Sequence, residues 1–124
     1  MKNLLHSFEG EIVEIDLDDD ENSWTGRIAK VFENDVLIVN IDKYGRELAW
    51  IAVSIENILL VRSNSNRLNM INGIYPAERQ KEYLTSGYSS AAEFLLKYAV
   101  ERNAYLNVSF KNASCELFAK GLSI

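Results

Sequence analysis

Five short apolar segments separated by compact breaks fill residues 9–62, and this rhythm limits the fold more than any other feature. The first segment, "EGEIVEIDL" at residues 9–17, alternates apolar residues with Glu14 and Asp16, which is the period-two pattern of a half-buried strand. The segment "VLIVNID" at residues 36–42 is dense in β-branched side chains, which favour strands. The pattern therefore predicts short strands joined by tight turns.

Glycine and polar turn residues mark off the other strand segments. The segment "WTGRIAKVF" at residues 24–32 carries Gly26, where a missing side chain lets a strand bend or bulge. The segments "LAWIAV" (48–53) and "ILLV" (58–61) are split by "SIEN", which is long enough for one turn of 3₁₀ helix. Five short, curved strands with such links predict a small β-barrel.

Together these segments resemble the SH3-like, and more narrowly the Sm-like (LSm/Hfq-type), small β-barrel over residues 9–63. The shared features are a glycine in strand two, a tight hairpin between strands two and three, and an aromatic-apolar fourth strand. A short helical turn and an apolar fifth strand complete the likeness. The resemblance implies a five-stranded barrel domain over residues 1–63 within a mainly β, mixed α+β chain.

The RNA-binding motifs of Sm proteins match this chain in part. Their first motif has an Asp and an Asn around the turn between strands two and three, whereas "FENDV" carries Asn34 and Asp35 in swapped order. Their second motif ends in Arg-Gly, often followed by Asn, and here Arg62 and Asn64 are kept without the glycine. The resemblance thus implies Asn34, Arg62 and Asn64 as candidate RNA-binding residues.

Beyond the barrel segments the composition changes. Residues 64–88 are polar and Asn-rich and contain the only proline, which predicts a linker with one short helix at residues 77–84. A capping box of Ser90 and Glu93 then predicts a helix over residues 90–103. The apolar arc of this helix is wide, so we expect it to be buried on more than one side, against the barrel or a second chain.

The end of the chain, "AYLNVSF" and "CELFAKGLSI", predicts a β-hairpin after that helix, within a unit of residues 89–124. The hairpin shares its period-two pattern and an Ala-Lys pair with the first two strand segments, so it can be read as the start of an incomplete second barrel. Unpaired strand edges must be covered. The first barrel, a partner chain in a swapped dimer, or further residues could cover these edges.

The acidic stretch "DLDDDENSWTGR" (residues 16–27) resembles a metal-binding loop more than any other part of the sequence does. Asp16, Asp18 and Asp20 have the one-three-five spacing of a calcium loop. Such a loop needs Gly at its sixth position and Glu at its twelfth, where this chain has Glu21 and Arg27. We therefore interpret the stretch as a solvated hairpin loop.

Other signs of catalysis are weak. His6 is the only histidine, in an N-terminal segment expected to be mobile, and Cys115 is the only cysteine. The chain carries no Gly-rich phosphate loop, nucleophile elbow or HExxH motif. We expect no catalytic residue, no metal and no cofactor, and we interpret the protein as not an enzyme.

Charge and cysteine usage bear on partners and compartment. Eighteen acidic against 13 basic residues give a formal net charge of −5, which disfavours RNA, since nucleic-acid binding relies on basic surfaces. The apolar runs are too short to cross a bilayer, so we expect no membrane contact. The lone cysteine favours a reducing cytoplasm.

The favoured function is a cytoplasmic, non-catalytic binding or assembly module that works through protein contacts. A homo-oligomer, dimer or higher, is expected because the helix at 90–103 is so apolar and because Sm-like barrels associate through strands four and five. The candidate interface residues are aromatic: Trp24, Tyr44, Trp50, Phe94 and Tyr98. Two alternatives remain open, namely an Sm-like RNA-binding regulator and a small-ligand pocket between barrel and helix.

Overall fold

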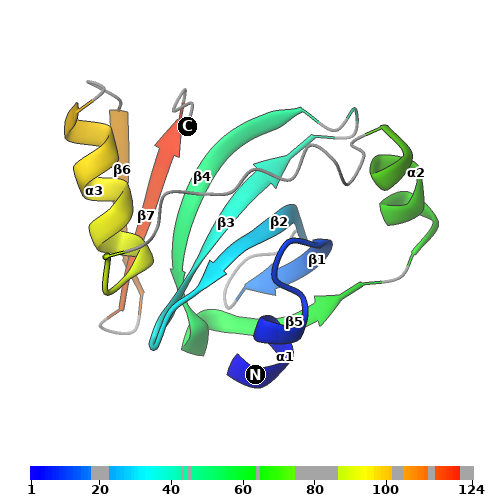
Figure 1. The fold of residues 1–124 in the computed structure, drawn as a ribbon, viewed down its shortest axis with the longest axis horizontal. Helices are drawn as coiled ribbons and strands as arrows, with labels where there is room; N and C mark the ends of the chain where they lie inside the picture. Colours follow the sequence, from blue (N-terminus) through cyan, green and yellow to red (C-terminus); the bar gives the residue numbers. More distant parts are fainter. Residues whose placement is uncertain are drawn as a thin grey trace.

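The computed structural model describes residues 1–17, 23–42, 44, 46–63, 65–74, 87–101, 105–111 and 114–120. Its elements in chain order are α1 (Lys2–Ser7), β1 (Ile12–Leu17), β2 (Trp24–Val31), β3 (Asp35–Ile41), β4 (Glu47–Ser54), η1 (Ile55–Asn57), β5 (Ile58–Arg62), α2 (Asn66–Ile74), α3 (Ala91–Glu101), β6 (Tyr105–Lys111) and β7 (Ser114–Lys120) (Figure 1). The fold is therefore mixed α+β, as the sequence predicted.

All the described strands form one antiparallel sheet in the order β5-β1-β2-β3-β4-β7-β6. The first five strands of the chain are contiguous in this order, and the C-terminal hairpin extends them at β4 (Figure 1). One edge of the hairpin is covered within the chain, because β7 pairs with β4 from Ala49↔Lys120 to Ala52↔Leu117, while β6 is an end strand of the described sheet. No pairing among the described strands closes the sheet into a barrel.

Strands β3 and β4 are apolar on both faces. One face of β3 carries Val36 and Ile38, and the other carries Leu37 and Val39. All four are buried, so these strands lack the apolar-polar alternation of a sheet with one wet face. Both faces must therefore be covered.

The first face forms what we call the inner cluster, around which the curved strands bend (Figure 1). Its buried members come from α1 and from β1 through β5: Leu5, Val13, Ile15, Leu17, Ile28, Val31, Val36, Ile38, Ile51, Val53, Ile58 and Val61. Because this cluster draws on every one of the first five strands, it is the core that holds them together.

The second face forms the outer cluster, where helices cover the sheet. Its members are Ile12, Phe32, Leu37, Val39, Ile41, Trp50 and Ala52 from the strands and their ends, Leu68 and Ile71 from α2, and Ala91, Phe94, Leu95 and Tyr98 from α3. Helix α3 packs on β3, β4 and β7. Figure 1 shows α3 beside the C-terminal hairpin and α2 at the opposite end of the molecule.

Gly26 is required by close packing between β2 and β3. A Cβ atom at this position would lie 2.7 Å from Ile38 Cγ2 and 2.9 Å from the Val39 carbonyl oxygen. The ladder shifts register further along, between Ile28 and Lys30. The predicted special role of Gly26 thus comes from the near approach of the neighbouring strand.

The N-terminal segment forms helix α1, which the sequence analysis did not predict. Leu5 of α1 is fully buried in the inner cluster. Lys2 Nζ lies 2.7 Å from Glu33 Oε2, and Glu9 Oε1 accepts a hydrogen bond from the Val31 amide at 3.0 Å. Burial of one leucine and these contacts with β2 and the turn after it hold a segment whose sequence has no sustained apolar run.

Helix α2 lies within the range that the sequence assigned to a linker. Ser65 Oγ accepts the Leu68 amide at 3.1 Å, and Leu68 and Ile71 reach the outer cluster. Leu68 and Ile71, at i,i+3 spacing among polar neighbours, were too few apolar residues to predict this helix from the sequence. The short helix predicted at residues 77–84 lies outside the described residues.

Helix α3 matches the helix predicted over residues 90–103, and its N-terminus carries two kinds of cap. Ser90 Oγ accepts a hydrogen bond from the Glu93 amide at 3.0 Å. The Glu93 carboxylate accepts a hydrogen bond from the Ser89 amide, one residue earlier than in the predicted capping box.

None of the described helices has the length and apolar character that a bilayer crossing requires.

Candidate binding surface

Arg62, a candidate RNA-binding residue, lies at the end of β5 in a network of polar side chains. Its Nε lies 3.2 Å from Glu14 Oε2, and its two terminal nitrogens lie 3.0 and 3.1 Å from the oxygens of Asp16. Ser23 Oγ accepts from the same guanidinium at 2.7 Å and donates to Asp16 Oδ1 at 2.5 Å. The network joins β1, β5 and the start of β2.

This network shifts the ionisation of both partners toward their charged forms. The hydrogen bond from Ser23 and the hydrogen bonds from Arg62 hold the pKa of Asp16 below its ordinary value. Hydrogen bonds to Asp16 and Glu14 hold the pKa of Arg62 above its ordinary value. Two carboxylates thus share one guanidinium, and the local charge is negative, which does not attract phosphate.

Asn34, a second candidate RNA-binding residue, is not brought to Arg62. Asn34 is exposed in the turn after β2, where its carbonyl oxygen accepts the Ile55 amide at 3.0 Å. Arg62 pairs with Glu14, which pairs with Thr25 at the beginning of β2. Asn64 lies outside the described residues. An RNA site made by these residues therefore stays a prediction.

Three of the five candidate interface aromatics lie inside the molecule, between the sheet and α3. Trp50 is 1% exposed and its ring centroid lies 6.2 Å from that of Phe94. Phe94 lies 4.4 Å from Tyr98 and packs edge-on against Tyr88 at 5.4 Å. These rings hold α3 on the outer face of the sheet. Most of the apolar surface of the helix is therefore buried within the same chain.

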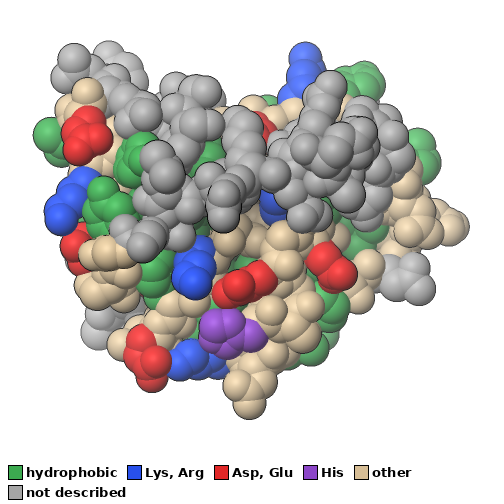
Figure 2. Space-filling view, in the orientation of Figure 1, with side chains coloured by type: hydrophobic (Ala, Val, Ile, Leu, Met, Phe, Trp, Pro, Cys, Tyr) green, Lys and Arg blue, Asp and Glu red, His purple; other side chains and the backbone are tan. Residues whose placement is uncertain are grey.

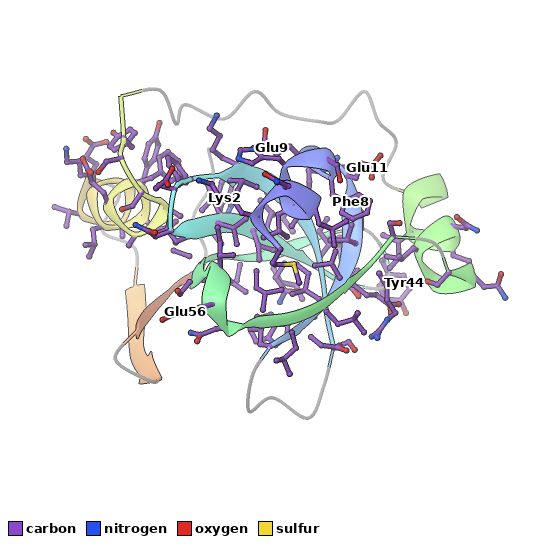
Figure 3. All side chains as sticks on the ribbon, turned by 90° about the horizontal axis from the view of Figure 1, so that it is seen from below. Lys2, Phe8, Glu9, Glu11, Tyr44 and Glu56 are labelled. Atoms are coloured by element: carbon purple, nitrogen blue, oxygen red, sulfur yellow. The ribbon has the colours of Figure 1, made fainter. Side chains whose placement is uncertain are left out.

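The remaining two aromatics are nearer the surface. Tyr44, after β3, is 55% exposed, and the Arg46 guanidinium lies 5.2 Å from its ring centroid. Figure 3 shows Tyr44 at the end of the molecule where α2 lies, away from η1 and Glu56. Trp24 is half-buried and packs against the inner cluster. Tyr44 and Trp24 are therefore not part of the aromatic cluster of Trp50, Phe94 and Tyr98.

A small apolar cavity opens beside Trp24, on the inner side of the sheet. It is lined by Ile15, Leu17, Trp24, Thr25, Ile38, Asn40, Ile51 and Val53. The space available to the centre of a water molecule is about 10 Å³, enough for one water. This cavity lies on the inner side of the sheet, whereas the sequence analysis placed its alternative ligand pocket between the barrel and the helix.

Exposed apolar side chains occur as adjacent pairs at two places. On β5, Leu59 is 62% exposed and Leu60 is 46% exposed. On the outer side of α3, Leu96 is 45% exposed and Val100 is 75% exposed. Figure 2 shows that the hydrophobic side chains over α3 alternate with charged ones, which is ordinary for a solvated helix face.

The two strands expected to mediate association have different environments. The outer side of β4 is occupied by β7, so β4 is an internal strand. The other strand, β5, pairs with β1 alone and is one end of the sheet described here. Sequence reasoning identified β5 as an apolar strand and expected contacts at its edge, but it did not predict that Leu59 and Leu60 are exposed. The unbroken run "ILLV" was the available signal, because a strand without alternation exposes apolar groups when one side is open.

Comparison with protein-family models, with curated proteins and with solved structures gives no match for this chain. The candidate surface therefore rests on the contacts and exposures described above.

Proposed function

We propose that this chain is a binding module that acts by protein contact, and that the open edge of β5 is its contact surface. The observation that carries the proposal is the pair of adjacent exposed leucines, Leu59 and Leu60, on a strand that pairs on one side only among the described strands. Exposed edges pair readily with other strands, and monomeric proteins usually protect them. We propose binding without catalysis, because Arg62 and Asp16 engage each other rather than a substrate site.

We further propose that β1 through β5 form an opened version of the SH3-like or Sm-like small barrel. Three features support this relation. The strands follow the order β5-β1-β2-β3-β4, the 3₁₀ turn η1 links β4 to β5, and one inner cluster draws on all five. In this interpretation the C-terminal hairpin occupies the side of β4 that would otherwise be free for a neighbour.

A tagged pull-down from the native host tests the contact surface. Wild-type protein is compared with Leu60→Lys, which places a charge on the edge, and with Leu96→Lys on α3. The two leucines are matched, because they are 46% and 45% exposed. We expect partners retained by the wild type and by Leu96→Lys to be lost with Leu60→Lys.

Mass spectrometry of the retained proteins, with an untagged copy of the chain co-expressed, reads the outcome. Equal retention of every partner by all three proteins would show that the edge of β5 is not the contact surface. Loss with Leu96→Lys alone would move the surface to α3.

A further inference from the structure

The turn between β3 and β4 presents an arginine whose hydrogen-bonding capacity is only partly used within the chain. The side chain of Arg46 is 72% exposed, and its Nε donates to Asp42 Oδ2 at 2.8 Å. Within the described part of the chain, its two terminal nitrogens make no hydrogen bond. Arg62 differs, because Glu14 and Asp16 occupy its guanidinium. Arg46 therefore keeps an open pair of donors at the surface.

Asp42 fixes the turn that carries this arginine. Its Oδ1 accepts hydrogen bonds from the amides of Tyr44 and Arg46 at 2.8 and 2.9 Å. Its own amide donates to the Arg46 carbonyl oxygen at 2.9 Å. An aspartate that bonds to the backbone a few residues further along is a common way to order a turn. Because the turn is ordered before a partner arrives, less entropy is lost on binding.

Tyr44 supplies an aromatic surface beside the arginine. It is 55% exposed, and the Arg46 guanidinium lies 5.2 Å from its ring centroid, within the range of a cation–π contact. Figure 3 shows Tyr44 at the end of the molecule where α2 lies. Tyrosine and arginine are among the residue types that contribute most to binding at protein interfaces. The turn thus holds a guanidinium and an aromatic ring side by side at the surface.

We propose that Tyr44 and Arg46 form a contact site for a carboxylate of a partner protein, with an apolar side chain next to that carboxylate. The donors of an arginine match the two oxygens of a carboxylate, and the apolar neighbour would pack on the Tyr44 ring. The site goes beyond the proposed function. Strands β3 and β4 are separated from β5 by β1 and β2 in the sheet, so the site does not depend on the β5 edge.

The charges around the turn favour a single carboxylate over the phosphates of a nucleic acid. Residues 42–47, "DKYGRE", contain two acidic and two basic residues, and the whole chain has a formal net charge of −5. Nucleic-acid binding relies on several cations that displace counterions from neighbouring phosphates. One open guanidinium in a turn without net charge suits one carboxylate.

Titration of the full chain with two peptides, followed by ¹H–¹⁵N NMR, tests the site. Acetyl-Phe-Glu-amide and acetyl-Phe-Gln-amide differ only in the carboxylate. We expect the glutamate peptide to shift the Arg46 Nε–H resonance and the amides of residues 42–48, with a dissociation constant on the order of 1 mM. The glutamine peptide should bind about fivefold more weakly, which is the upper range for an exposed ion pair.

Two substitutions at Arg46 separate charge from geometry. Arg46→Gln should abolish the difference between the two peptides. Arg46→Lys keeps the charge but loses the paired donors, so it should reduce the difference without abolishing it.

Lys97→Gln on α3 is the matched control. Lys97 Nζ lies 5.2 Å from the Tyr88 ring centroid and 3.3 Å from Glu93 Oε1, so it repeats the cation, ring and acid of the turn without the paired donors of an arginine. Its loss should leave both titrations as in the wild type.

Equal binding of the two peptides by the wild type would overturn the inference, as would a difference that survives Arg46→Gln. Shifts confined to residues outside 42–48 would place the carboxylate elsewhere. A short oligothymidylate that binds more tightly than the glutamate peptide, and weakens with Arg46→Gln, would assign the site to nucleic acid instead. None of these results bears on the β5 edge, which the Leu60→Lys pull-down tests separately.

Discussion

At the scale of single residues, the contacts of Arg62 decide what its charge can do. An arginine after an apolar strand suggests a free cation for a phosphate, yet here Glu14, Asp16 and Ser23 surround the guanidinium. Two carboxylates and one guanidinium make the site acidic. The same side chain thus serves to join β5 to β1.

The Asp16–Ser23 hydrogen bond makes a testable contribution to stability against acid. Because the folded pKa of Asp16 lies below its ordinary value of 3.8, its stabilisation is present above that pH and lost as the pH falls through the folded pKa. We predict that Ser23→Ala, which removes the largest cause of this shift, loses less stability than the wild type on acidification. Urea unfolding midpoints at several acidic pH values measure the difference.

Ser7→Ala is the control for this prediction. Ser7 Oγ donates to the Leu4 carbonyl oxygen at 2.6 Å and to no carboxylate among its described contacts. Its removal should leave the slope of stability against pH as in the wild type. A Ser23→Ala protein with the wild-type slope would contradict the role given to this hydroxyl.

At the scale of elements, the first residue of β3 completes the cap of α3. The two carboxylate oxygens of Asp35, in β3, accept the amides of Ala91 and Ala92 at 2.9 and 3.1 Å. A negative group at a helix N-terminus also interacts favourably with the helix dipole. The β2–β3 hairpin and α3 are therefore joined by a contact that spans more than 50 residues of sequence.

We predict that Asp35→Ala destabilises the protein by about 1 kcal/mol, the usual cost of a lost helix cap. Urea unfolding measures the loss, and amide hydrogen exchange should show faster exchange at Ala91 and Ala92. Asp35→Asn keeps one oxygen acceptor and should lose less.

Asp42→Ala supplies the matched control for the cap. Asp42 accepts amides of Tyr44 and Arg46 in another turn, at 2.8 and 2.9 Å. Its loss can lower stability, but it should leave exchange at Ala91 and Ala92 unchanged at matched stability. If Asp35→Ala also leaves that exchange unchanged, the cap does not hold α3.

At the scale of the whole molecule, two apolar clusters share the same strands. Adjacent residues of β3 and β4 point alternately into the inner and the outer cluster, as Ile51 and Trp50 do. Loss of either cluster would expose one face of strands that the other cluster needs. The sheet and α3 should therefore unfold together.

The two tryptophans allow this cooperativity to be measured. Trp24 packs against the inner cluster and Trp50 lies within the outer one. We predict that in Trp24→Phe and in Trp50→Phe the urea midpoint by fluorescence equals the midpoint by far-UV circular dichroism. An earlier fluorescence midpoint in Trp24→Phe, where Trp50 reports, would show that α3 separates before the sheet unfolds.

Local pattern was enough to predict the strands and the longest helix. Alternation, β-branched runs and the Ser90 cap each act over a few neighbouring residues, and β1 through β5 and α3 follow from them. Helices α1 and α2 were not predicted, because Leu5 and the pair Leu68 and Ile71 are stabilised by burial in clusters built from distant strands. Local propensity cannot report such burial.

The candidate binding surface was likewise predicted only in part from the sequence. The sequence by itself determined the mixed α+β class and an apolar fifth strand. Only the tertiary structure decided that β7 covers β4, that β5 stays an edge, and that Trp50, Phe94 and Tyr98 face inward. Strand order and helix docking depend on contacts between residues far apart in the chain, and one sequence read locally does not contain them.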